Sequence, residues 1–211
     1  MCWAYCRKGR IYRVKRIIFA TGNAGKMREI REIMADMDVE ILSMKEAGIT
    51  ADIVEDGATF EENAVIKAKA IAAYTDDIVL ADDSGLEVDY LNKEPGVYSA
   101  RYMGEDTSYD IKNQAILDRL AGVPKEQRTA RFVCAIAAVL PNKEALVTRE
   151  TIEGYIGDKP AGANGFGYDP IFYVDEYGCS TAELSEEAKN AISHRGKALR
   201  AMKALLHQNG F

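Results

Sequence analysis

Apolar residues group into short runs and helical stripes along the chain. Residues 17–20 form an apolar run that ends at a glycine turn over 21–23, which predicts a buried strand. Over residues 27–37, methionine and isoleucine recur every three or four positions with charged side chains between them, as is typical of an amphipathic helix. A second apolar run at 39–42 predicts another strand.

The middle of the chain repeats this pattern with clearer boundaries. Residues 44–58 have the composition of a loop, after which Thr59 and Glu62 have the spacing of a helix capping box. Apolar side chains at helical spacing follow them. A third strand is predicted at 78–81, and we expect it to stop at the polar sequence 82–85.

Later elements follow a different order. A further helix is predicted to begin at the Thr107–Asp110 motif. Residues 131–140 and 146–155 predict two long strands joined by a turn, and a helix is predicted over 185–206. Because strands alternate with helices at first and pair as hairpins later, the predicted fold class is α/β with a mixed sheet.

Composition and charge exclude several classes of protein. At 211 residues the chain can bury a substantial core, so it is neither a disulfide-stapled miniprotein nor a disordered tail. Its longest apolar run, 132–140, falls well short of the ~20 residues that span a membrane. The formal net charge is −6 and residues 1–16 contribute +6, so the remainder carries −12. This acidic body argues against nucleic acid as the main partner but permits a small phosphorylated ligand.

The basic N-terminal segment lacks the apolar stretch of a signal peptide. We expect residues 1–15 to form a disordered extension, with a functional basic arm as the alternative, and 16–211 to form one two-lobed domain. The four cysteines lack the paired spacing of a zinc site, and two histidines cannot build a histidine-rich one. A reduced, cytoplasmic protein without membrane contact is therefore expected.

The turn from Thr21 to Lys26 joins a predicted strand to a predicted helix. Backbone N–H groups at a helix N-terminus, together with a lysine, form a natural cradle for phosphate. The segment is not a Walker A loop, because position 20 is alanine and Met27 follows the lysine. An ordinary strand-to-helix turn with an exposed lysine is the alternative.

Two adjacent carboxylates, Asp82 and Asp83, follow directly after the predicted strand at 78–81. In open α/β sheets, ligands bind beyond the carboxyl ends of the strands. A pair of carboxylates placed there needs a cation, and Mg²⁺ suits it because this ion takes oxygen ligands and bridges phosphates. The alternative is a turn whose charges are solvated.

Three further segments carry candidate chemistry. Lys67 lies near the buried stripe of its predicted helix, so its ammonium group either reaches solvent or meets an anion. In the glycine-rich segment 164–170, Phe166 or Tyr168 can stack on a nucleobase, and a hairpin loop pinned by aromatic rings is the alternative. The segment 193–196 can begin a new helix that presents histidine and arginine donors, with a continuous, partly exposed helix as the alternative.

Six segments together are more specific than any one of them. In chain order they are TGNAGK (21–26), EDGATFEENA (55–64), ADDSG (81–85), PGVYSARY (95–102), GFGYDPIF (165–172) and SHRGKAL (193–199). Over residues 16–206 the chain closely resembles the inosine-triphosphate pyrophosphatase family. The resemblance implies an elongated mixed β-sheet with flanking helices and two lobes around a substrate cleft. It also implies a homodimer that uses Mg²⁺ to hydrolyse ITP, dITP and XTP to the monophosphate and pyrophosphate.

The same resemblance implies roles for single residues. Asp83 would be the general base, and Lys67 and Lys26 would neutralise phosphate charge. The metal would be held by Glu55 and Asp83, with Asp82 beside them. The residues implied in substrate binding are Thr21, Gly22, Asn23, Ala24, Gly25, Lys26, Ser84, Phe166, Gly167, Tyr168, Asp169, Lys189, His194 and Arg195.

Base selectivity and the competing functions follow from these roles. His194 and Arg195 can donate to the 6-keto group of hypoxanthine or xanthine, whereas the 6-amino group of adenine would leave them unsatisfied. A Maf-like pyrophosphatase of modified pyrimidine nucleotides is one alternative, and the segments 165–170 and 193–196 argue against it. The others are a non-catalytic nucleotide-binding regulator and a nucleic-acid-binding module that uses the basic N-terminal arm.

Overall fold

The computed structural model describes residues 15–211, so the expectations for residues 1–14 lie outside the described part. Seven strands form one sheet: β1 (Arg16–Phe19), β2 (Glu40–Ser43), β3 (Ile78–Val88), β4 (Thr129–Val139), β5 (Ala145–Ile156), β6 (Phe172–Val174) and β7 (Cys179–Ser180). Five α-helices accompany them: α1 (Ala24–Ile33), α2 (Phe60–Ala72), α3 (Tyr109–Arg119), α4 (Glu186–Ile192) and α5 (His194–Gln208). Four short 3-10 turns complete the structure: η1 (Asp89–Leu91), η2 (Gly96–Arg101), η3 (Lys125–Gln127) and η4 (Asp169–Ile171). The predicted α/β class with a mixed sheet is confirmed.

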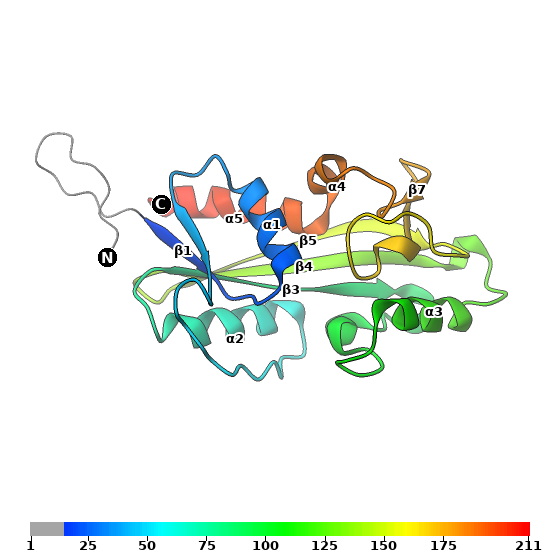
Figure 1. Cartoon of the computed structure of the whole chain (residues 1–211), viewed down its shortest axis with the longest axis horizontal. Helices are drawn as coiled ribbons and strands as arrows, with labels where there is room; N and C mark the ends of the chain where they lie inside the picture. The colour runs from blue at the N-terminus through cyan, green and yellow to red at the C-terminus, as the bar shows by residue number, and fades with distance from the viewer. Residues whose placement is uncertain (1–14) are drawn as a thin grey trace, which may run out of the picture.

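The sheet is mixed, and its three long central strands run along the length of the molecule (Figure 1). Its order is β2-β1-β3-β4-β5-β6-β7. The contacts of β1 with β2 and β3 are parallel, and all the others are antiparallel. Helices α1, α4 and α5 lie on one side of the sheet, and α2 and α3 lie on the other (Figure 1).

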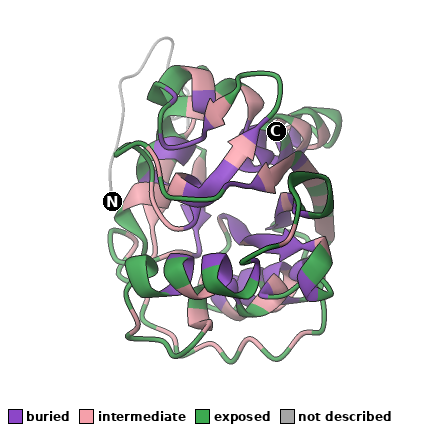
Figure 2. Cartoon of the chain, turned by 90° about the vertical axis from the view of Figure 1, so that its right-hand side faces the viewer, coloured by how far each residue is buried: buried purple, intermediate pink, exposed green. Residues whose placement is uncertain are grey.

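At the end of the sheet that contains β1 and β2, side chains alternate along the strands and form one hydrophobic core on each face. Ile17 and Leu80 face the α1 and α5 side, where they join a cluster with Met27 and Leu199. Their neighbours in sequence point the other way, and Val79 packs in the cluster beneath α2. Because side chains alternate across a strand, one apolar run supplies both cores. Buried segments therefore line the sheet, while the outer sides of the helices are exposed (Figure 2).

A third hydrophobic cluster lies at the other end of the sheet, away from β1 and β2. It joins the far ends of β3, β4 and β5 to α3 and the segment around β6, with Leu86, Ile116 and Phe172 near its centre. The two ends of the sheet thus have separate cores. Across residues 15–211, no helix is both long enough and apolar enough to span a membrane.

The prediction that the third strand stops at Ala81 is wrong. Strand β3 continues through the polar sequence to Val88, because β4 pairs with it along this whole length, from Val79↔Val139 to Val88↔Ala130. On its other side, β1 pairs only as far as Phe19↔Leu80. Within residues 15–211, one edge of β3 therefore has no strand beside it just where its carboxylates begin.

Helix boundaries mostly agree with the capping signals. The Thr59 hydroxyl accepts a hydrogen bond from the Glu62 N–H, as the capping box predicts, while the Glu62 carboxylate accepts from the Ala58 N–H. Helix α3 is capped by Ser108 instead of Thr107, because it is the Ser108 hydroxyl that accepts from the Ile111 N–H.

The C-terminal helix is in fact two helices. The break lies at Ser193, whose extended backbone ends α4 and whose hydroxyl accepts a hydrogen bond from the Gly196 N–H at the start of α5. Of the two alternatives for residues 193–196, the structure has the new helix, which Ser193 caps. Two short strands, β6 and β7, are not predicted by the sequence pattern, because at three and two residues they are too short to show a period.

Candidate active site

A cavity of about 430 Å³ opens where β1 ends and β3 continues. Its walls come from the turn before α1, the loop that carries Glu55, helix α2, β3, the glycine-rich loop and the start of α5. Most of the predicted site residues line it: Thr21, Gly22, Asn23, Lys26, Glu55, Lys67, Asp82, Asp83, Ser84, Phe166, Gly167, Tyr168, Asp169, Lys189, His194 and Arg195. Ala24 and Gly25, also predicted to bind substrate, are not among its lining residues.

The two adjacent carboxylates belong to different clusters. Because β3 is extended through them, consecutive side chains leave opposite faces of the sheet. Asp82 follows the face of Leu80 and meets side chains of α1 and α5. Asp83 follows the face of Ala81 and meets side chains of α2. The expectation that the two carboxylates lie at a strand end is wrong, because both lie within β3. Both still line the same cavity, and both lie in the field of Lys26 and Lys67.

Asp83 lies in a buried cluster with Lys67. The Lys67 ammonium donates to Asp83 Oδ1 at 3.2 Å and to Glu55 Oε2 at 2.9 Å. The second oxygen of Asp83 accepts from the Asn63 amide at 3.2 Å. Burial and the nearby Glu55 carboxylate raise the pKa of Asp83, while Lys67 opposes this shift. Burial opposes the charge on Lys67, but the surrounding carboxylates prevail and raise its pKa.

Asp82 lies in the other cluster and is 1% exposed. Its Oδ2 atom lies 2.8 Å from the Lys26 ammonium and 3.4 Å from Nε and Nη2 of Arg195. Its Oδ1 atom is buried and has no hydrogen-bond partner among the described residues. Burial alone would raise the pKa of Asp82, but Lys26 and Arg195 together hold it well below the usual range. Asp82 is therefore an ionised carboxylate that binds two cationic side chains.

The predicted phosphate cradle stands at the N-terminus of α1. Asn23 caps the helix, since its side-chain oxygen accepts from the Lys26 N–H at 3.1 Å. The Thr21 hydroxyl accepts from the Asn23 N–H at 3.2 Å and holds the turn. The helix dipole and its free N–H groups favour an anion here, and Lys26 adds a positive charge directed into the cavity.

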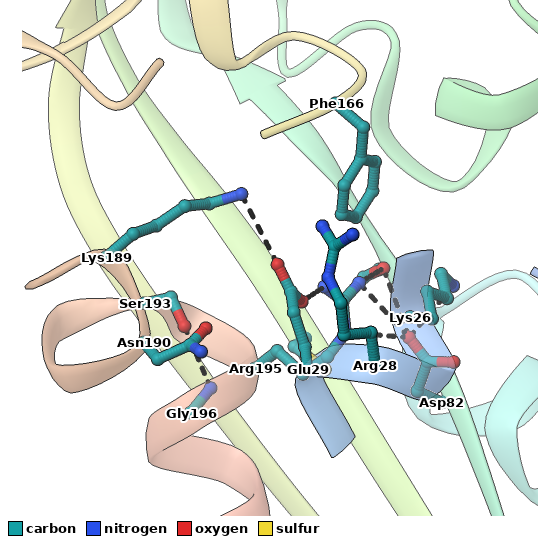
Figure 3. A network of polar contacts seen from close by, with 12 residues as sticks. Lys26, Arg28, Glu29, Asp82, Phe166, Lys189, Asn190, Ser193, Arg195 and Gly196 are labelled. Atoms are coloured by element: carbon teal, nitrogen blue, oxygen red, sulfur yellow. Dashed lines mark hydrogen bonds and ion pairs between the residues drawn. The ribbon is translucent and has the colours of Figure 1, made fainter. Parts of the chain in front are cut away.

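The glycine-rich loop presents Phe166 to the cavity. Gly165 and Gly167 have φ values of +75° and +71°, which residues other than glycine rarely adopt. Between them, the Phe166 N–H donates to the Asp169 carboxylate at 2.8 Å. The Phe166 ring lies over the Lys189 ammonium at 4.9 Å and the Arg195 guanidinium at 5.6 Å (Figure 3). The backbone of Phe166 is therefore fixed by a hydrogen bond, and two cationic groups lie next to its ring.

His194 is held neutral beside this ring system. Its imidazole stacks on Phe132, with the ring centroids 5.0 Å apart, and its Nδ1 atom is buried without a hydrogen-bond partner among residues 15–211. Burial, Arg195 and Lys189 lower the pKa of His194 well below its usual value. A neutral imidazole that faces the cavity can donate one hydrogen bond and accept another.

Two buried residues of the site escaped the sequence reasoning. Glu29 on α1 binds both Lys189 and Arg195, and Figure 3 shows it between them. Asn63 on α2 donates to Asp83 and accepts from the Gly57 N–H at 2.9 Å. Glu29 comes one helical turn after Lys26, and Asn63 follows the capping box, so helical spacing from these motifs was the available signal.

The donor set fits a divalent cation beside Asp83. Glu55 and Asp83 already share one cationic group, the Lys67 ammonium. Magnesium sites commonly use one or two carboxylates, with water and substrate phosphate completing the shell. In the described part of the chain, no group of three or more carboxylate, histidine or cysteine side chains could hold a metal ion. A metal at this position would thus need oxygen ligands from outside the protein.

Comparisons with known proteins agree with this geometry. The Ham1 family model matches residues 17–205, nearly the whole of the described chain. The chain belongs to the Ham1 family. A dITP/XTP pyrophosphatase of Bacillus licheniformis is 50% identical over 196 residues, which cover 92% of this chain and 100% of that protein. The Bacillus subtilis protein of the same description is 47% identical, over 92% of this chain and 98% of its own length.

Solved structures of Ham1 proteins share the fold. The Staphylococcus aureus Ham1 protein aligns with a TM-score of 0.83 and 42% identity, and the Coxiella burnetii HAM1 protein with 0.84 and 40%. Each alignment covers 92% of this chain and 100% of the other. The expected membership of the inosine-triphosphate pyrophosphatase family is confirmed, and the matched range agrees with the 16–206 over which the motifs were recognised.

Proposed function

We propose that this Ham1 protein hydrolyses the purine nucleoside triphosphates ITP, dITP and XTP to the monophosphate and pyrophosphate, with Mg²⁺ as cofactor. One observation carries the proposal: a single cavity joins the Lys67–Asp83 cluster to an aromatic and basic pocket around Phe166. The first feature suits chemistry at a phosphate and the second suits a purine base. The names of the dITP/XTP pyrophosphatases that this chain resembles support the same reaction.

The triphosphate would lie between α1 and α2. The N-terminus of α1 offers N–H groups, and Lys26 and Lys67 offer positive charge from opposite sides of the cavity. Before substrate arrives both lysines are paired with carboxylates, Lys26 with Asp82 and Lys67 with Asp83. Neutralising and positioning the phosphates is the main catalytic task, because phosphoryl transfer needs little covalent help from the protein.

Asp83 would take the proton of the attacking water. The water oxygen forms a bond to the α-phosphorus, the α–β anhydride bond breaks, and pyrophosphate leaves with the electron pair. The raised pKa of Asp83 favours proton acceptance, and Asn63 and Lys67 fix the carboxylate in place. Glu55 and Asp83 would hold Mg²⁺, which supplies charge neutralisation at the phosphates when bound.

The base would stack on Phe166 and be read by Arg195 and His194. Both can donate to a 6-keto oxygen, and the neutral state of the imidazole leaves it one donor only. Adenine would present an amino group to these donors and leave them unsatisfied, which is costly in a buried site. Hypoxanthine and xanthine are therefore favoured over adenine.

The expected homodimer, cytoplasmic location and division into 1–15 and 16–211 remain part of this proposal. The family resemblance supports the homodimer, and the concentration of basic residues before position 17 supports the division of the chain. The Maf-like alternative has no comparable support, since the segments around Phe166 and His194 both line the cavity as a purine site requires.

Pyrophosphate release from ITP, dITP, XTP, GTP and ATP, with Mg²⁺ and with EDTA, tests the proposal. We expect fast, Mg²⁺-dependent release from the first three and little from GTP and ATP. Absence of release from all five, with ITP still bound, would favour a nucleotide-binding regulator. Equal release from ITP and ATP would contradict the proposed base reading.

A further inference from the structure

A series of charges of alternating sign connects the base pocket to the phosphate cradle. Asp169 binds Lys189 at 2.7 Å, Lys189 lies 3.4 Å from Glu29, and Glu29 binds Arg195. From Arg195 the series continues through Asp82 to Lys26. Figure 3 shows its central part, with Arg195 beneath Phe166 and between the two carboxylates. The two ends of the proposed substrate site are therefore in electrostatic contact.

In this series, Asp82 contacts both Lys26 of the phosphate cradle and Arg195 of the base pocket. A single oxygen, Oδ2, receives Lys26 at 2.8 Å and Arg195 at 3.4 Å, and the Ser84 hydroxyl also lies 3.4 Å away. The other oxygen, Oδ1, is buried and has no partner in residues 15–211. The two cations thus share one acceptor, and Lys26 holds the shorter contact.

When one cation leaves an acceptor that two cations share, the remaining cation binds that acceptor more strongly. A charge pair at 3 to 4 Å in a buried site is screened far less than in water, so Arg195 gains when Lys26 leaves. Lys26 can leave, because it stands at the N-terminus of α1, where a triphosphate offers it oxygens of higher charge. Arg195 has no such freedom, since Glu29 holds its other side.

We propose that Asp82 couples the two ends of the site: when a triphosphate draws Lys26 away, Asp82 holds Arg195 alone, and the base pocket discriminates between purines more sharply. Asp82 is a positioning residue in this scheme. The inference rests on the proposed function for its substrate class. Its consequence is that triphosphates are sorted by base, while the monophosphate product is bound with little regard to base.

The scheme predicts opposite effects for two variants. In Asp82→Asn the full negative charge is absent, so Arg195 keeps only its contacts with Glu29 and Ser84, whether or not a triphosphate is bound. In Lys26→Met the competitor is absent, so Asp82 holds Arg195 in every state. In each variant the protein should distinguish hypoxanthine from adenine equally well in monophosphates and in triphosphates. In Asp82→Asn both affinity ratios should be as low as the monophosphate ratio of the unmodified protein. In Lys26→Met both should be as high as its triphosphate ratio.

Calorimetric binding with Mg²⁺ measures this without turnover. The probes are IMP and AMP, and the α,β-methylene analogues of ITP and ATP, which resist cleavage of the bond in question. In the unmodified protein, we expect the ITP-to-ATP affinity ratio to exceed the IMP-to-AMP ratio by about fivefold or more, as is usual for coupled sites. In Lys26→Met the IMP-to-AMP ratio should rise by the same factor.

Lys67→Met is the matched control. It removes the other lysine that faces the phosphates, whose hydrogen bonds go to Glu55 and Asp83. Its affinity should fall for all triphosphates while the difference between the two ratios persists. If Asp82→Asn does not fold, as circular dichroism would show, the comparison of the two lysine variants decides the matter.

Three results would overturn the coupling: equal ratios in the unmodified protein, an unchanged IMP-to-AMP ratio in Lys26→Met, or the same change in Lys67→Met as in Lys26→Met. Failure of the proposed function is seen separately, as absence of pyrophosphate release from ITP by the unmodified protein. Because the coupling is measured by binding alone, either result can occur without the other.

Discussion

The Nζ atom of Lys67 lies 3.2 Å from Oδ1 of Asp83, which joins helix α2 to the centre of strand β3. The lysine is buried, and its charge is retained because carboxylates surround it. The aspartate is buried as well, and its pKa is raised. An acid and a cation held together in this way serve both proton transfer and charge neutralisation, which gives the first prediction.

Asp83→Asn should lower the rate of pyrophosphate release by at least about a hundredfold, the usual contribution of a general base. The fold should persist, because Lys67 keeps its contact with Glu55 at 2.9 Å. Steady-state turnover of ITP and thermal unfolding measure the two effects. Asp175→Asn, which removes a largely exposed carboxylate bound to Lys125, is the control and should turn over normally. Turnover of the Asp83 variant at the normal rate would exclude Asp83 as the base.

Lys26→Ala should weaken substrate binding more than it slows the chemical step. A hydrogen bond between charged groups is worth ~1.5–3 kcal/mol, so the KM for ITP should rise about tenfold to a hundredfold. Steady-state kinetics separate KM from kcat. Lys45→Ala removes an exposed lysine outside the cavity and should change neither. An unchanged KM in the Lys26 variant would argue against a phosphate cradle at α1.

The stability of the protein should decrease as the pH falls below about 6.5. His194 has a lowered pKa in the folded state, so its contribution to stability is present above the pKa of an unfolded histidine and is lost as the pH falls toward the folded value. One such group gives a slope of up to ~1.4 kcal/mol per pH unit. Chemical denaturation between pH 7 and pH 5 measures it.

His194→Gln is the matched variant for this pH dependence. It removes the titrating group from its place against Phe132 and should reduce the slope below pH 6.5. The only other histidine, His207, is exposed and stays in both proteins. A slope that is unchanged in the variant would assign the pH dependence to other groups.

Gly85→Ala should destabilise the fold by ~1–3 kcal/mol, the usual cost of overpacking. A Cβ atom at this position in β3 would lie 2.4 Å from Ser99 Oγ and 2.5 Å from the Gly96 carbonyl oxygen. The segment that contains them covers the edge of β3, so it would have to move. Gly22→Ala is the control for stability, since nothing lies within 4 Å of a Cβ there. Urea denaturation distinguishes the two, and equal stability of both variants would contradict the expected clash.

Local signals in the sequence determined most of the elements and many site residues. Short apolar runs, helical stripes and the caps at Thr59 and Ser193 act between residues only a few positions apart, so they can be read without a fold. The ordered motifs then identified the family. The turn at Lys26 and the loop at Phe166 both carry local features, a helix start and paired glycines, and both line the cavity as predicted.

Only the tertiary structure decided how the carboxylates are divided. Whether β3 ends at Ala81 depends on β4, whose partner Ala135 for Asp83 lies 52 positions along the chain. Because β4 keeps the strand extended, Asp82 and Asp83 point to opposite faces, one toward Lys26 and the other toward Lys67. Neighbours in sequence thus pair directly with different lysines, and their different environments give them opposite pKa shifts.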